Sequence, residues 1–278
     1  PTFNRAHLIQ IPIKSILNQT FEDWELIIID DGSTDNTQEI VTGYNDSRIR
    51  YFWQENQKES AARNHGIVRA QAEWICFQDS DDAYLPDHLA VLYDGIKNNP
   101  EYKCIKTGLI IYQDGKEIHR TDIKPTFKYD TFPYEAFTTG CYHRLVFDTI
   151  KFDERFFAGE DLHFILQVGL KHAIKILPKW TGITYYNPEN SGRTGKNYES
   201  RIKNHRACLR DVLIWNQTLI QPFLIRARCL NEMQLFSGHL KYNRYKLLEA
   251  ILSNIAVIFK YPMTYLRLSF EILTKNKL

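Results

Sequence analysis

The sequence predicts an α/β domain in which a mostly parallel sheet is flanked by helices, followed by a helical C-terminal extension. Three observations favour this class. Short apolar runs alternate with segments of helical periodicity through residues 1–112, and polar turn residues end the runs. The run at residues 24–30 (WELIIID) is continuously apolar, as in a parallel strand buried on both faces. With 278 residues, 44% of them hydrophobic, the chain can form one large domain with an appendage.

The alternation can be followed element by element. The expected strands are residues 24–30, 49–53, 74–78 and 103–112. The expected helices are residues 5–18, 37–44, 60–70 and the stretch behind Pro86, a good first helical residue. The opening residues Pro1-Thr2-Phe3-Asn4-Arg5 have turn chemistry that ought to follow a strand. We therefore expect the first strand of the sheet to lie ahead of this chain.

The pattern changes after residue 112. Asp114-Gly115 predicts a hairpin, residues 121–133 an irregular loop, and the chain beyond Tyr198 is helical in character. The chain is accordingly divided into a domain of residues 1–198, with halves of about 1–112 and 113–198, and a helical region of residues 199–278.

The charge is unevenly distributed. Residues 1–200 carry 22 Lys and Arg against 29 Asp and Glu, whereas residues 201–278 carry 13 against 4. A basic, partly apolar tail suits either peripheral contact with an anionic membrane or packing on the body or on a second subunit. Nucleic-acid binding is not expected, because no nucleic-acid module accompanies the charge.

Two further features bear on the compartment. The five cysteines form no CxxC pair and no zinc-ligand spacing, so we expect a reducing compartment, the cytoplasm. The longest apolar stretch, residues 247–259, has 13 residues, short of the roughly 20 that a membrane-spanning helix needs. We expect a cytoplasmic protein, with the cytoplasmic membrane face as a possible site of contact.

Acidic residues follow two of the predicted strands. Asp30-Asp31 ends the strand at 24–30, and Asp79-Ser80-Asp81-Asp82 follows the strand at 74–78. Ligands of open parallel sheets bind at such strand ends, and an Asp-x-Asp there can hold a divalent cation that accepts diphosphate oxygens. Asp and Ser are also ordinary turn and N-cap residues, so either cluster alone has a structural explanation. The pair, without a Gly-rich phosphate loop, favours metal-assisted binding of a nucleotide diphosphate.

A third acidic point opens a predicted helix. Gly159-Glu160-Asp161 precedes an apolar helical stretch, where acids complement the helix dipole. If this carboxylate pair faces the metal site, one of its members could act as a general base toward an acceptor hydroxyl.

A set of short motifs recurs in a fixed order over residues 1 to about 190. They are Pro1-Thr2-Phe3-Asn4-Arg5, Gln19-Thr20-Phe21, residues 30–35 (DDGSTD), residues 60–66 (SAARNHG), residues 79–82 (DSDD) with Leu85-Pro86, Phe152-Asp153-Glu154 and Gly159-Glu160-Asp161. In kind and order they resemble the motifs of glycosyltransferase family 2, which has the GT-A fold. The resemblance implies transfer of a sugar from a nucleotide diphosphate, with inversion at the anomeric carbon.

The resemblance also implies roles for individual residues. It assigns nucleotide-sugar binding to Thr2, Asp30, Asp31, Arg63 and Asp79. It assigns Mg²⁺ or Mn²⁺ to Asp81 and Asp79, the catalytic base to Asp161, and acceptor contact or orientation to Glu160. The half of residues 1–112 would then bind the donor and the half of residues 113–198 the acceptor.

Other positions are open to two interpretations. Arg193 lies in residues 185–195, where the family often has a loop that closes on the donor; a solvated loop is equally compatible. Trp180, Tyr185 and Tyr186 could form an apolar floor for a sugar or belong to the core. Lys58 and Glu59 stand where the family often has small residues. The Q-x-x-R-W signature of processive synthases is missing.

The expected protein is thus a metal-dependent, hexosyltransferase-type, nonprocessive inverting glycosyltransferase. Its donor is expected to be a UDP-sugar, and its acceptor a glycan or lipid-linked glycan of the cell surface. Two alternatives remain open on the sequence: a nucleotidyltransferase, and a sugar-nucleotide-binding scaffold without catalysis.

Overall fold

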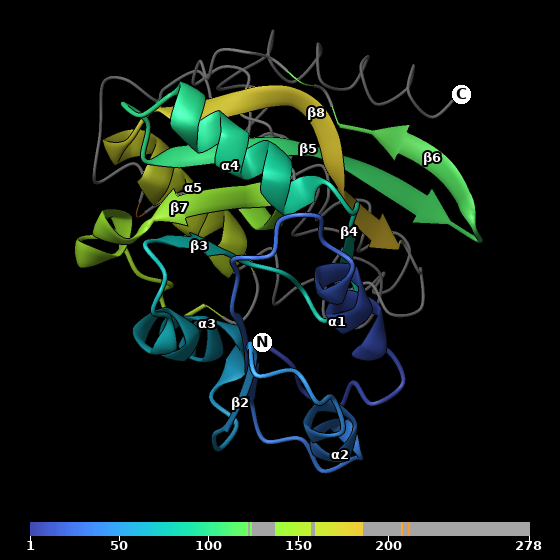
Figure 1. The fold of residues 1–278 in the computed structure, drawn as a ribbon. Coiled ribbons are helices and arrows are strands. Elements are labelled where there is room, and N and C mark those ends of the chain that lie inside the picture. The colour runs from blue at the N-terminus through green and yellow to red at the C-terminus, as the bar shows by residue number, and fades with distance from the viewer. Residues whose placement is uncertain (122, 124–136, 157–158, 186–206, 208–210, 212–278) are drawn as a thin grey trace, which may run out of the picture. The chain divides into compact units, whose positions relative to one another are not determined.

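The computed structural model describes residues 1–121, 123, 137–156, 159–185, 207 and 211 (Figure 1). The chain forms two compact units, one of Pro1–Phe127 with Pro133–Asn187, the other of Lys128–Phe132 with Pro188–Leu278. The helices and strands named below, and the predicted site residues other than Arg193, belong to the first unit. Arg193, Tyr186 and the basic tail, apart from residues 207 and 211, lie outside the described residues. Among the helices described, none is long and apolar enough to cross a membrane.

The predicted order of elements is largely confirmed. The helices are α1 (Gln10–Leu17), α2 (Thr37–Thr42), α3 (Lys58–Arg69), α4 (His88–Asn98) and α5 (Glu160–Lys171). The strands are β1 (Leu26–Asp30), β2 (Ile49–Trp53), β3 (Trp74–Cys76), β4 (Ala83–Tyr84), β5 (Cys104–Gln113), β6 (Lys116–Arg120), β7 (Gly140–His143) and β8 (Ile174–Tyr185). The predicted hairpin joins β5 to β6, and both Asp114 and Gly115 have positive φ, as such a turn requires.

The strands form two sheets. Strands β1 and β2 pair in parallel, and Thr2 adds a parallel bridge to Asp30 at the end of β1. The second sheet has the order β3-β7-β5-β8-β4, with β6 on β5.

The α/β class with flanking helices is confirmed, but the second sheet is mixed rather than mostly parallel. Among its described pairs only β5 and β8 are parallel. The prediction missed β7 and β4, which have four and two residues. Strands this short carry too little periodicity to be recognised, and β7 enters antiparallel between β3 and β5.

Helices cover both faces of the second sheet, with α4 on one face and α5 on the other (Figure 1). On the α4 side, Leu92 packs with Ile105 of β5 and Cys141 of β7. The core also holds a cluster of aromatic rings, in which Phe152 and Phe164 stack with centroids 4.3 Å apart and Phe77 meets both edge-on. Aromatic rings bury large apolar areas, so this cluster is a rigid base for the residues above it.

His88 is a fully buried polar side chain at the start of α4. Its Nδ1 lies 2.6 Å from Oγ1 of Thr181, and its ring stacks on Tyr84 at 3.7 Å between centroids. Burial lowers the pKa of His88 to about 3. The imidazole is therefore neutral in the folded protein at any pH near neutrality.

The burial of His88 predicts that the stability of the fold decreases in acid. In the unfolded chain His88 takes up a proton near pH 6.5, whereas in the folded protein it does not. The contribution of neutral His88 to the free energy of unfolding is therefore complete above pH 6.5 and is lost as the pH falls toward 3. The free energy of unfolding should fall by about 1.4 kcal/mol per pH unit in that window through this residue. In urea unfolding between pH 7 and 5.5, His88→Gln should show a shallower pH dependence than the exposed control His7→Gln. Equal slopes would contradict the assignment.

Candidate active site

A buried arginine joins two of the predicted acidic points. Arg63, on α3, is 5% exposed. Its Nη2 donates to Oδ1 of Asp79 at 3.0 Å, and its Nη1 donates to Oε1 of Glu160 at 2.9 Å. The guanidinium also lies over the rings of Phe137 and Phe152, at 4.9 and 5.3 Å from their centroids. Arg63 thus ties α3, the acidic loop after β3 and the first turn of α5 together.

The electrostatics of this triad follow from its burial. Burial alone would lower the pKa of Arg63, but the charges of Asp79 and Glu160 outweigh it and raise the pKa. Burial raises the pKa of Glu160; Arg63 opposes this rise, and the neighbouring Asp161 adds to it. Arg63 therefore stays charged, and it compensates the largely buried Glu160 carboxylate.

The acidic loop presents Asp81 beside Asp79. Burial, and then the charge of Asp79, raise the pKa of Asp81, while Arg5 acts the other way from 3.8 Å. Both carboxylates keep more than a third of their side-chain surface exposed, at 37% for Asp79 and 38% for Asp81. Asp82 differs, because it is buried and accepts a hydrogen bond from Oγ1 of Thr184 on β8 at 3.0 Å.

These carboxylates fit a hard divalent cation. Mg²⁺ and Mn²⁺ prefer oxygen ligands, and two neighbouring carboxylates that are each more than a third exposed offer such ligands. Asp81 and Asp79 are thus the residues that would hold it.

The start of α5 leaves Asp161 free to face solvent. Gly159 occupies the N-cap with φ of 82°, a left-handed conformation that favours glycine. Glu160 then turns inward to Arg63, whereas Asp161 is exposed and accepts the amide of Leu162 at 2.7 Å through one oxygen. The two predicted acids thus have different environments, as a positioning group and a base would need.

Asp30 and Asp31 both accept hydrogen bonds within the fold. Asp30 is fully buried and accepts hydrogen bonds from the amide of Ser33 and the hydroxyl of Tyr51, both at 2.7 Å. Asp31 accepts Nε2 of Gln54 at 2.7 Å and the amides of Gln57 and Lys58 at 2.8 Å. Asp30 thus fixes the turn after β1, and Asp31 fixes the turn that leads into α3.

Thr2 is 3% exposed, and its backbone bonds the end of β1, with its amide 2.9 Å from the carbonyl of Ile29. Contacts of Thr2, Asp30, Asp31 and Arg63 with a nucleotide stay predictions.

Three motif residues have tethering roles that the sequence reasoning missed. Asn64 donates to the carbonyl of Phe152 at 2.9 Å and accepts its amide at 3.1 Å, and Ser60 donates to the carbonyl of Phe156 at 3.2 Å. Both project from α3 beside Arg63, so their helical spacing was the available signal. Gln19 bonds the carbonyl of Leu85 and the amide of Leu89, which ties α1 to the start of α4.

The predicted aromatic floor is only partly described. Nε1 of Trp180 donates to the carbonyl of Thr121 at 2.7 Å, and Tyr185 is 47% exposed at the end of β8. Tyr186 and Arg193 are outside the described residues. A contact of these side chains with a sugar stays a prediction.

Comparison with known proteins agrees with the motifs. Residues 1–156 match Glycosyl transferase family 2. A Campylobacter jejuni protein named GalNAc(5)-diNAcBac-PP-undecaprenol beta-1,3-glucosyltransferase is 32% identical over 174 residues, which cover 58% of this chain and 55% of that protein. The Escherichia coli UDP-Glc:alpha-D-GlcNAc-diphosphoundecaprenol beta-1,3-glucosyltransferase WfgD is 40% identical over 101 residues, which cover 36% of this chain and 40% of WfgD. The matches thus span little more than half of these relatives at most.

The solved structures confirm the predicted GT-A fold. Staphylococcus aureus TarS 1-349, crystallised in complex with UDP-GlcNAc, superposes with a TM-score of 0.68 at 20% identity, covering 95% of this chain and 80% of that one. At this identity the likeness shows the fold alone.

The Arg63 triad predicts a large and specific loss of stability. Arg63→Met leaves Glu160 as a buried, uncompensated carboxylate, and removing one partner of such a pair costs about 3–5 kcal/mol. Adding Glu160→Gln should restore part of the loss, because it removes that charge. Arg120→Met, which breaks an exposed pair with Glu117, is the control and should leave stability nearly unchanged. Urea unfolding measures all three, and similar values for Arg63→Met and Arg120→Met would count against the triad.

Proposed function

Because this chain belongs to glycosyl transferase family 2, we propose that it moves one sugar from a nucleotide-diphosphate donor to an acceptor hydroxyl, with inversion and without processive addition. The observation that carries the proposal is the Arg63 triad. It joins the acidic loop of residues 79–82 to the turn that carries Asp161. In a single displacement the acceptor hydroxyl attacks the donor sugar directly, so the donor site and the base that takes the hydroxyl proton must be adjacent.

The proposed donor is a UDP-sugar, bound near Asp79 and the turn of residues 2–5. Support comes from the name of WfgD, which specifies UDP-Glc, and from the UDP-GlcNAc bound to TarS, which has the same fold. Asp79 is the most exposed of the predicted contacts within the described residues. Arg63, already bonded to two carboxylates, would act by orienting Asp79.

The cation proposed for this site is Mg²⁺ or Mn²⁺, held by Asp81 and Asp79. When bound, it would supply positive charge to the departing diphosphate. The chain's own part is to orient the two carboxylates, through Arg5, through Arg63 and through the turn in which the amide of Asp82 donates to the carbonyl of Asp79 at 3.2 Å.

Asp161 is the proposed general base. As the acceptor oxygen forms its bond to the anomeric carbon, the bond from that carbon to the diphosphate oxygen breaks, and the hydroxyl proton passes to the Asp161 carboxylate. Attack opposite the leaving group inverts the anomeric centre. Glu160 stays bonded to Arg63 and holds the turn in place.

The proposed acceptor is a lipid-linked glycan of the cell envelope. The names of the Campylobacter and Escherichia relatives both specify undecaprenol-diphosphate substrates. Such an acceptor lies at a membrane, where the basic residues 201–278 are the proposed peripheral contact.

Incubation with a panel of sugar nucleotides, Mn²⁺ and lipid-linked acceptors tests the proposal. Acceptor-dependent release of nucleoside diphosphate is the expected result. Release of pyrophosphate from a nucleoside triphosphate and a sugar phosphate would point to a nucleotidyltransferase instead. Binding without turnover would point to a scaffold.

Asp161→Asn should abolish transfer and leave donor binding almost intact, because the carboxylate acts on the acceptor proton. Loss of a general base costs about 10²- to 10⁴-fold in rate. Asp114→Asn, at the β5–β6 turn, is the matched control with unchanged rate. Normal turnover of Asp161→Asn would remove this residue from the mechanism.

Asp81→Asn should instead weaken the binding of UDP in the presence of Mn²⁺, because the cation loses a charged ligand. Calorimetric titration with and without Mn²⁺ measures this. In Asp81→Asn we expect the affinities for UDP with and without Mn²⁺ to become nearly equal. In the control Asp114→Asn, Mn²⁺ should still raise the affinity for UDP. A full Mn²⁺ effect in Asp81→Asn would refute the metal assignment.

A further inference from the structure

A chain of hydrogen bonds runs from the last turn of α3 to the end of β1, and we call its four residues, Arg69, His65, Gln54 and Asp31, the His65 network. Nε of Arg69 donates to Nε2 of His65 at 3.0 Å, and Nδ1 of His65 lies 2.8 Å from Oε1 of Gln54. Nε2 of Gln54 then donates to Oδ1 of Asp31 at 2.7 Å. Neither His65 nor Gln54 is among the site residues predicted from the sequence.

Each bond of the His65 network has only one possible direction. The guanidinium of Arg69 can only donate, so Nε2 of His65 must carry a lone pair. The ring proton is then on Nδ1, which donates it to Oε1 of Gln54 and keeps the NH₂ group of Gln54 toward Asp31. Burial, and then the charge of Arg69, lower the pKa of His65, in agreement with a neutral ring.

The donors that orient Asp31 are neutral. They are the side-chain amide of Gln54 and the backbone amides of Gln57 and Lys58, the last two at 2.8 Å. Within the described part of the chain, no Lys, Arg or His forms an ion pair with Asp31, because two neutral side chains stand between it and the guanidinium of Arg69. The network therefore holds the carboxylate in place without neutralising its charge.

The carboxylate of Asp31 keeps one position for a further donor. A carboxylate has about four acceptor positions, two on each oxygen. Oδ1 accepts from Gln54 and Gln57, whereas Oδ2 accepts only the amide of Lys58 among the residues described. Asp31 is also 4% exposed, in contrast to the wholly enclosed Asp30. An N–H or O–H group of a bound molecule can therefore complete the hydrogen bonds of Oδ2.

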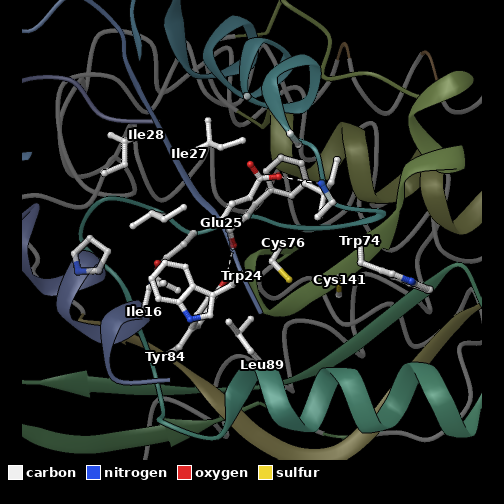
Figure 2. A pocket seen from close by; sticks show the side chains of 18 of the residues that line it. Ile16, Trp24, Glu25, Ile27, Ile28, Trp74, Cys76, Tyr84, Leu89 and Cys141 are labelled. Carbon is white, nitrogen blue, oxygen red and sulfur yellow. Dashed lines mark hydrogen bonds between the residues drawn. The ribbon is translucent and has the colours of Figure 1, made fainter. Parts of the chain in front are cut away.

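The other end of the His65 network is anchored. The guanidinium of Arg69 lies 4.8 Å from the ring centroid of Phe52, and the carbonyl of Arg69 accepts Nη1 of Arg50 at 3.0 Å. Arg50 also donates to Oε2 of Glu25 at 2.7 Å, beside the apolar cavity between β1 and β3 (Figure 2). His65 thus accepts its hydrogen bond from a guanidinium that is itself held in place.

We propose that His65 is a positioning residue for the nucleotide of the donor: it fixes the amide of Gln54, which in turn fixes the Asp31 carboxylate against which the nucleotide binds. The inference rests on the proposed function, since it takes Asp31 as a donor contact. Loss of the Nδ1–H group frees the side chain of Gln54 and lowers the affinity for the nucleotide. Asp161 is outside the network, so the rate at saturating donor is spared.

Replacements of His65 can separate its two ring nitrogens. In His65→Asn the side-chain NH₂ group takes nearly the place of Nδ1–H and can still donate to Gln54. In His65→Gln the amide instead reaches the place of Nε2, on the side of Arg69. His65→Leu removes both groups, and His119→Leu, on the exposed strand β6, is the control.

Calorimetric titration with UDP and Mn²⁺ measures Kd, and transfer assays measure KM for the donor and kcat. In His65→Leu we expect Kd and KM to rise about tenfold, comparable to the loss of one hydrogen bond, with kcat changed by less than about twofold. His65→Asn should restore most of the affinity and His65→Gln should not. Loss of fold stability alone would not produce this order or this separation of KM from kcat.

Nitrogen chemical shifts of the imidazole test the network without any ligand. At pH 7.5 we expect His65 to carry its proton on Nδ1 and a lone pair on Nε2. A ring protonated on Nε2 alone would overturn the proposal, because it could not donate to Gln54.

The binding results separate this proposal from the proposed function. Equal UDP affinities in wild type and His65→Leu, or in the Asn and Gln variants, would show that His65 has no positioning role and would leave the proposed function standing. If His65→Leu does not fold, the comparison of Asn with Gln decides. Nucleotide binding without sugar transfer would contradict the proposed function alone, since the order of Kd values still tests His65. Failure of the wild type to bind UDP, GDP or dTDP would contradict both.

Discussion

The geometry of the candidate site depends on one buried positive charge. Arg63 satisfies two carboxylates that come from opposite ends of the domain sequence, Asp79 and Glu160, in surroundings made apolar by Phe137 and Phe152. In such surroundings an unpaired carboxylate is costly, so the three groups must stay together for the fold to persist. A guanidinium suits this position because it offers two donors in a fixed plane, one for each acid, which a lysine ammonium cannot do.

The consequence is a division of work among the acids. Glu160 and Asp82 are anchored by Arg63 and Thr184, and Asp30 and Asp31 hold the turns that bring α3 to its place. Asp79, Asp81 and Asp161 remain accessible to ligands. Carboxylates of the same motifs thus differ in environment: some are buried in hydrogen bonds that hold the fold, and others are exposed at the same edge.

The sequence predicted the elements whose signal is local. A continuous apolar run located β1, and the apolar periodicity behind Pro86 located α4, because side-chain burial imposes those patterns. The mixed pairing could not be predicted, since β4 and β7 are too short to carry a period and their partners are set by tertiary packing.

The same limit applies to the site. Sequence reasoning found the acidic residues but not their burial or partners, as Asp30 illustrates with both oxygens bonded inside the protein. The spacing of Ser60, Arg63 and Asn64 on α3 did carry information, because it places all three on one helix face.

The turn of residues 2–5 connects the end of β1 to the acidic loop of residues 79–82. Thr2 continues the edge of β1, and two residues later the amide of Asn4 donates to Oγ of Ser33 at 2.8 Å while its side chain accepts the amide of Thr34. Arg5 then reaches Asp81 in the acidic loop. These hydrogen bonds hold the turn to the loop after β1, so the position of Arg5 beside Asp81 depends on the end of β1. Pairing of Thr2 at the end of β1 and arrangement of the acidic edge are in this way parts of one structural constraint.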